Sequence, residues 1–205
     1  MTNDIATYLK FANLQMAAES LFGVVQGASA GQTSQTMDVS SLILGNNRSS
    51  KFTNIQATEF AANWRVVEHI SNTPTGFSGT LFKYTGETDA AKGLTNGELV
   101  MSFRSTEFLD DSARDNQATN SMEIKPYGWA FGQIADMQNW YAQLQADPSK
   151  LQGKAFSVTG YSLGGYLATV CASRRHAAAK YSKRSICYKN NSCLRTIYKR
   201  CSPKT

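Results

Sequence analysis

The chain has only two histidines among its 205 residues, and no aspartate or glutamate follows Asp147. Histidine, the most frequent general base, is therefore scarce, and the part of the sequence after Asp147 contains no carboxylate side chain. No apolar stretch reaches the roughly 18 to 20 residues of a membrane-spanning helix, and residues 1–6 have neither the basic nor the apolar region of a secretory signal peptide. We expect a protein without a membrane span, either cytoplasmic or exported by a signal that is not N-terminal.

Cysteine is absent before residue 171. The four cysteines all come late in the chain: Cys171, Cys187, Cys193 and Cys201. Their spacing does not match a C-x-x-C zinc pair, so no structural zinc site is predicted. We expect free thiols rather than a structural disulfide, which stays the alternative. No cofactor motif is visible, and the acidic segment 110–115 does not form a recognisable calcium-binding loop.

The charge of the chain is divided between two parts. Its 21 Lys and Arg residues and 15 Asp and Glu residues give a net charge of +6. Residues 1–171 contain all of the acids and carry −4, whereas residues 172–205 carry +10. The basic balance is therefore a property of the last part, and the acidic body has no electrostatic footprint for nucleic acid.

The length is that of one domain. After residue 172, large aliphatic side chains become rare and charges follow no period, so this segment cannot bury enough apolar surface to offset its ordering entropy. We expect an incomplete folded domain over residues 1–172 and a basic, cysteine-containing, disordered tail over residues 173–205. A truncated gene or a shifted reading frame would explain such a tail.

The periodicity of apolar residues predicts alternating helices and strands. Helices are expected at residues 4–22, 58–68 and 129–146 and from residue 163, with strands at 78–84, 99–104 and 155–159 and a loop at 28–40. The first two strands should form a hairpin with a long connection. A strand, a helix and a further strand then imply a parallel pairing and an α/β layer architecture.

The most informative motif is G-x-S-x-G, formed by Gly160, Ser162 and Gly164. It follows an apolar strand and precedes a helix, which is the context that a nucleophile elbow needs. On such an elbow the serine has a strained backbone, and the two glycines leave room for a close approach of strand and helix. Because so short a motif also arises by chance, a glycine-rich turn that only packs closely remains the alternative.

A second segment adds to this motif. The expected strand 99–104 leads into Phe103-Arg104-Ser105-Thr106, Asp115 follows, and the elbow comes after the next strand. In this order the features resemble the class 3 lipase family, the fungal-type lipases and their bacterial relatives, over roughly residues 60–172. The resemblance implies a partial α/β-hydrolase fold, with a mixed sheet flanked by helices. Ser105 stands where the family usually has glycine, which affects the local turn.

The resemblance implies a role for each residue. Ser162 would be the nucleophile that attacks an ester carbonyl, and the backbone N–H of Leu163 would be one oxyanion donor. Thr106 would supply the other donor, through its N–H and its hydroxyl, and Asp115 would hold that hydroxyl in place. Residues 107–122 occupy the position of the family's lid. The alternatives are an ordinary strand-end residue for Thr106 and a solvated loop acid for Asp115.

The base and acid of a catalytic triad are missing from the expected positions. In this superfamily an acid and then a histidine follow the serine. No acid follows Ser162, and His176 would lie about 20 Å away along a continuous helix. His69 precedes the strands and is expected at the end of a helix.

We therefore expect a serine carboxylester hydrolase of lipase type that acts on a lipid or another ester through an acyl-serine, and that is inactive in this chain alone. Phospholipase, acyltransferase and peptidase chemistry share the elbow and stay open. Missing later strands would leave an exposed apolar sheet edge. The other reading is a non-catalytic binding module whose basic tail contacts anionic lipid or an acidic partner.

Overall fold

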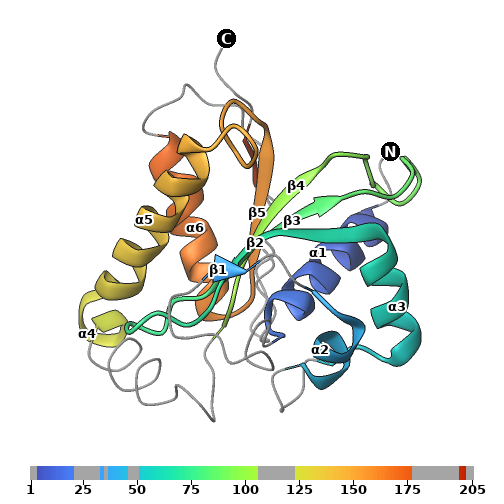
Figure 1. The fold of residues 1–205 in the computed structure, drawn as a ribbon. Helices are drawn as coiled ribbons and strands as arrows, with labels where there is room; N and C mark the ends of the chain where they lie inside the picture. The colour runs from blue at the N-terminus through green and yellow to red at the C-terminus, as the bar shows by residue number, and fades with distance from the viewer. Residues whose placement is uncertain are drawn as a thin grey trace.

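The computed structural model describes residues 4–20, 33–34, 37–45, 51–105, 123–176 and 199–201. Within these segments the chain forms one mixed sheet with helices on both faces (Figure 1). The six strands are neighbours in sequence order: β1 (Thr33–Ser34), β2 (Trp64–Ile70), β3 (Gly79–Tyr84), β4 (Leu99–Phe103), β5 (Phe156–Gly160) and β6 (Lys199–Cys201). Four of them, β2 to β5, are five residues or longer. The expected α/β class is confirmed.

The helices form two layers. One face of the sheet is covered by α1 (Asp4–Ala18), α2 (Val39–Leu44) and α3 (Asn54–Asn63), and the other by α4 (Lys125–Tyr127), α5 (Phe131–Ala146) and α6 (Leu163–His176) (Figure 1). None of the helices among the described residues combines the length and apolar character that crossing a membrane requires.

The pairing of the strands places the ends of β4 and β5 together. β2, β3 and β4 are antiparallel neighbours, which confirms the expected hairpin. β4 and β5 are parallel, with Ser102 beside Thr159 and Phe103 beside Gly160. The crossover between them contains α5, as the alternation of strand and helix predicted. Both strands therefore end at the same edge of the sheet.

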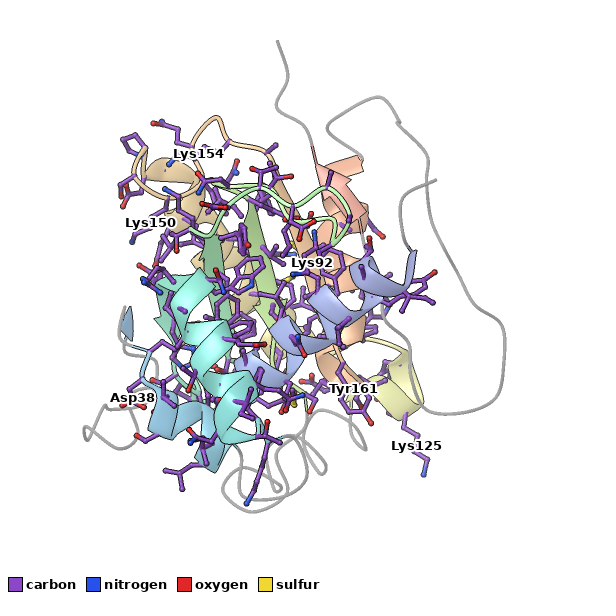
Figure 2. The ribbon with its side chains drawn as sticks, turned by 90° about the vertical axis from the view of Figure 1, so that its right-hand side faces the viewer. Asp38, Lys92, Lys125, Lys150, Lys154 and Tyr161 are labelled. Carbon is purple, nitrogen blue, oxygen red and sulfur yellow. The ribbon has the colours of Figure 1, made fainter. Side chains whose placement is uncertain are left out.

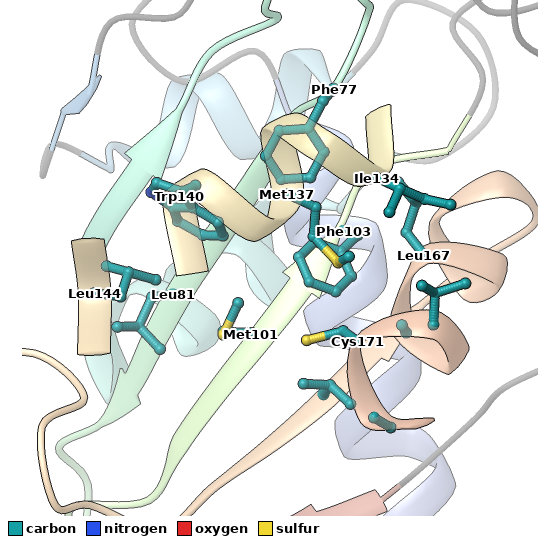
Figure 3. Packing of buried hydrophobic residues seen from close by; sticks show 14 of the residues in the cluster. Phe77, Leu81, Met101, Phe103, Ile134, Met137, Trp140, Leu144, Leu167 and Cys171 are labelled. Atoms are coloured by element: carbon teal, nitrogen blue, oxygen red, sulfur yellow. The ribbon is translucent and has the colours of Figure 1, made fainter. Parts of the chain in front are cut away.

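Each face of the sheet has its own apolar core. On the side of α1 and α3 the buried side chains include Phe11, Leu14, Phe60 and Phe82. On the side of α5 and α6, Figure 3 shows Phe77, Met101, Phe103, Met137, Trp140 and Leu167 packed between helices and sheet. Because β4 and β5 are buried on both faces, their burial pattern is continuous rather than alternating.

The helix predicted at 58–68 is wrong in its bounds. A capping box between Thr53 and Gln56 starts α3 earlier, at Asn54. The helix ends at Asn63, and Trp64–Ile70 is the strand β2 instead. Trp64–Ile70 contains aromatic and β-branched residues, which suit a strand, and buried and exposed residues alternate at its start. Pairing with β3 stabilises the strand over the helix that the spacing also allowed. His69 therefore lies in a strand, and its predicted position at a helix end is wrong.

Three other boundaries also differ from the predictions. α1 ends at Ala18 rather than at residue 22, and the predicted loop 28–40 contains β1 and the start of α2. α6 continues past residue 172 to His176, and residues 199–201 form β6 on the outer side of β5. The predicted open edge is therefore covered along Phe156, Ser157 and Val158. The rest of the predicted tail lies outside the described residues.

Candidate active site

The turn between β5 and α6 contains only two residues, Tyr161 and Ser162. Ser162 has φ +51°, and no other non-glycine residue in the described segments has a positive φ. The left-handed region costs an L-residue about 1 kcal/mol or more, so this backbone is strained. The Ser162 side chain is exposed, and none of the described side chains hydrogen-bonds to its Oγ. The hydroxyl is thus presented to solvent on a sharp bend.

The two glycines of the motif are required by close backbone contacts. A Cβ atom on Gly160 would lie 2.2 Å from the carbonyl oxygen of Gly164. A Cβ atom on Gly164 would lie 2.2 Å from the carbonyl oxygen of Phe103 and 2.7 Å from that of Arg104. The first turn of α6 therefore lies directly against the ends of β4 and β5. Close packing alone explains the glycines, but it does not explain the strain and exposure of Ser162.

One predicted oxyanion donor can be placed. Leu163 is the first residue of α6, so its backbone N–H has no acceptor within the helix. The helix N-terminus adds a partial positive charge at this position. Thr106 and Asp115 lie outside the described residues, as does the predicted lid over 107–122. Beyond β4, the described residues end at Ser105.

The end of β4 is held by the end of α1. The backbone N–H of Ser105 donates to Oε1 of Glu19 at 2.8 Å. Nη2 of Arg104 donates to the carbonyl oxygens of Glu19 and Ser20, at 3.2 and 2.9 Å. Glu19 and Arg104 are only 2% and 4% exposed. Sequence reasoning missed Glu19, although an acid at the apolar end of a predicted helix was a visible signal.

An exposed aromatic segment, residues 127–131, lies beside the first turn of α6. The Tyr166 hydroxyl of α6 donates to the carbonyl oxygen of Gly128 in this segment at 3.0 Å. Burial raises the pKa of Tyr166, so this hydroxyl stays protonated. Tyr127, Trp129 and Phe131 are 67%, 48% and 57% exposed. Figure 2 shows Tyr161, the neighbour of Ser162, at the same end of the molecule as Lys125 of α4.

Neither histidine of the chain is placed to serve Ser162. His69 in β2 is 1% exposed, and its Nδ1 lies 2.8 Å from Oγ1 of Thr80. Burial, and then the nearby Arg104 charge, lower its pKa to about 3, so it is neutral near pH 7. Two strands separate β2 from β5, which puts them roughly 14 Å apart. His176 is the last residue of α6, about 20 Å along the helix from Leu163.

Other features of the described segments do not form a second reaction centre. No cluster of three His, Cys, Asp or Glu side chains with metal-binding geometry occurs in them. A groove of about 810 Å³ lies between α1, α3 and the β3–β4 connection, and its lining includes Leu9, Lys10, Glu59, Trp64, Asp89 and Lys92. Ser162 does not line this groove. We therefore base the site on the elbow rather than on the groove.

No family model matches the chain, and comparisons with curated proteins and with solved structures find no similar protein.

Proposed function

We propose that the chain is a serine carboxylester hydrolase of lipase type on an α/β-hydrolase scaffold, with Ser162 as its nucleophile. The observation that carries the proposal is the positive φ of the exposed Ser162 at the turn from β5 to α6. A strained, exposed serine between a parallel strand and a helix is the arrangement of a nucleophile elbow. The contacts of Gly160 and Gly164 fit this arrangement, because they let the strand and the helix approach closely on either side of Ser162.

The proposed reaction passes through an acyl-serine. Ser162 Oγ attacks the ester carbonyl, its proton goes to a base, and the alcohol leaves after protonation. Water then attacks the acyl-serine and releases the carboxylic acid. The N–H of Leu163 stabilises the oxyanion, and Thr106 supplies the second donor, held by Asp115. One such donor contributes roughly 3 kcal/mol to transition-state stabilisation.

The positions of the histidines limit the rate expected of this chain. His69 is buried in the sheet and uncharged, and His176 lies at the far end of α6. Ser162 therefore has no base among the described residues, and an unassisted serine hydroxyl is a weak nucleophile. Only the residual catalysis of an elbow and oxyanion donors is expected.

The exposed aromatic segment supports an apolar acyl group in the substrate. Tyr127, Trp129 and Phe131 expose large rings beside α6, where polar residues would be usual for a surface without a ligand. A long acyl chain bound along these rings would bury apolar area from both partners. We therefore propose a lipid-like ester rather than a short, polar one.

Chemical rescue by imidazole tests the proposal, because a free base can replace the one that is lacking. With p-nitrophenyl butyrate, imidazole should accelerate esterolysis by the full chain beyond imidazole's own reaction, and mass spectrometry should find the acyl group on Ser162. Ser162→Ala should show only the reaction of imidazole itself. Ser173→Ala, which removes another exposed serine of α6, is the matched control. Equal rates for Ser162→Ala and the unchanged chain would contradict the proposal.

A non-catalytic binding function is the second candidate, and the distant histidines favour it. Residues 172–205 carry +10 without any acid, which would attract anionic lipid at about 1 kcal/mol per charge near the surface. Flotation of the full chain with phosphatidylserine vesicles, against phosphatidylcholine vesicles as control, measures this attraction. Salt-sensitive flotation together with no acylation of Ser162 would favour the binding function over hydrolysis.

A further inference from the structure

The buried carboxylate of Glu19 lies at the end of the strand next to the elbow. Glu19 follows the last residue of α1, yet its Oε1 accepts the backbone N–H of Ser105, 86 positions later in the chain, at 2.8 Å. Burying a carboxylate is costly unless it is well hydrogen-bonded. The position of Glu19 therefore calls for an explanation beyond the packing of α1.

Arg104, just after β4, also joins this part of the chain to the end of α1. Its guanidinium donates to two carbonyl oxygens at the end of α1 and to Oδ1 of Asn72, at 3.3 Å. Because arginine has a rigid, planar set of donors, these bonds set the direction of the chain at residue 104. The backbone beyond β4 is thus held by its own side chain and by Glu19.

Gln15 holds the second strand of the site. Its Nε2 donates to Oγ1 of Thr159 at 2.7 Å, and Thr159 precedes Gly160 of the elbow. Gln15 and Glu19 are four residues apart, so they project from the same side of the end of α1. The last turn of α1 and the residue after it therefore contact both β5 and the backbone that follows β4. Their relative positions are set by side chains of a third element.

We propose that Glu19 is a positioning residue for the proposed esterase site, where it holds the backbone after β4 against the first turn of α6. The proposal rests on the proposed function. The Ser105 peptide is planar, so fixing its N–H also fixes the direction in which the chain leaves β4. The proposed site needs an oxyanion donor from the chain that follows β4, and such a donor is effective only if it points at the oxyanion before the reaction begins. Glu19 touches no substrate and acts through Ser105.

Two variants of equal charge isolate the hydrogen bond. Glu19→Gln and Glu19→Met both remove the negative charge and keep a similar length, but only glutamine retains an oxygen acceptor for Ser105. The first measurement is hydrogen exchange of the Ser105 amide in the full chain. Exchange should rise about tenfold or more in Glu19→Met and only a few-fold in Glu19→Gln. The Met101 and Val158 amides inside the sheet should not change.

The second measurement is imidazole-rescued esterolysis with kcat and KM determined separately. Glu19→Met should lower kcat about tenfold with KM within about twofold, and Glu19→Gln should restore most of kcat. Glu68→Gln is the matched control, because Glu68 is another buried carboxylate whose partners, Trp140 and Lys150, lie elsewhere. It should leave both Ser105 exchange and kcat unchanged.

The outcomes separate the two proposals. Unchanged Ser105 exchange in Glu19→Met, or a kcat loss shared equally with Glu68→Gln, would overturn the role of Glu19 while leaving the nucleophile intact. Esterolysis that survives Ser162→Ala would overturn the proposed function, and the exchange measurement would still decide whether Glu19 holds Ser105. If Glu19→Met fails to fold, the comparison uses Glu19→Gln and Glu68→Gln instead. The positioning role would be overturned if the Ser105 amide exchanged no faster in Glu19→Gln than in Glu68→Gln.

Discussion

Gly164 of α6 lies against Phe103 of β4 so closely that a Cβ atom at position 164 would stand 2.2 Å from the Phe103 carbonyl oxygen. The contacting atom belongs to the backbone of a buried strand, so it cannot move aside as a flexible side chain would. The distance between helix and strand is thus set by the absence of a side chain.

We predict that Gly164→Ala costs about 3 kcal/mol or more in the free energy of unfolding, because helix and strand must separate. Gly153→Ala is the control. Gly153, unlike Gly164, has a positive φ, +67°, but a Cβ there would meet no atom within 4 Å. It should cost only about 1 kcal/mol. Urea unfolding of both variants measures the difference, and equal costs would show that the close approach does not matter.

We predict that Ser162→Gly leaves the fold at least as stable, because relief of the steric cost at φ +51° offsets the larger unfolded-state entropy of glycine, each about 1 kcal/mol. Ser162→Ala keeps the Cβ atom and should leave the stability nearly unchanged. Thermal unfolding of the three proteins compares them. A destabilised Ser162→Gly would mean that the backbone at this position is not strained.

We predict that His69 makes the protein less stable in mild acid. Its folded-state pKa of about 3 lies below the ordinary value of 6.5, so the unfolded chain takes up a proton first as the pH falls. Its contribution to stability is therefore full above pH 6.5 and declines as the pH falls toward 3. The free energy of unfolding should fall by about 2 kcal/mol between pH 7.5 and pH 5 from this residue alone.

The test compares urea unfolding at both pH values. His69→Gln should remove that part of the pH dependence, and His176→Gln controls for the loss of the other histidine. An unchanged pH dependence in His69→Gln would show that His69 does not titrate as the structure implies.

We predict that Phe131→Ser weakens the binding of long-chain esters. Loss of the exposed ring should raise KM for p-nitrophenyl decanoate about tenfold and leave the acetate unaffected, since only a long chain reaches apolar surface. The measurement is imidazole-rescued esterolysis of both esters. Ile55→Ser removes an exposed apolar side chain from α3, on the other face of the sheet, and should change neither value. Equal effects on both esters would contradict this role of the aromatic segment.

The elements that could be predicted from the sequence are those whose structure follows from the local pattern of apolar residues and glycines. Continuous apolar runs predicted β4 and β5, and the glycine spacing around Ser162 predicted the turn between β5 and α6. Local pattern failed at Trp64–Ile70, where pairing with β3 overrides a spacing that also suits a helix. The bond between Glu19 and Ser105 could not be predicted at all, because it joins residues 86 positions apart.

The antiparallel strand β6 changes what can join this sheet. Three residue pairs, Phe156–Cys201, Ser157–Arg200 and Val158–Lys199, occupy the outer side of β5. An incoming strand from another segment or another molecule must first displace β6. Because β6 pairs with only three of the five residues of β5, a longer strand that matches the whole of β5 would form more ladder hydrogen bonds than β6 does. We therefore expect displacement of β6 to favour longer strands.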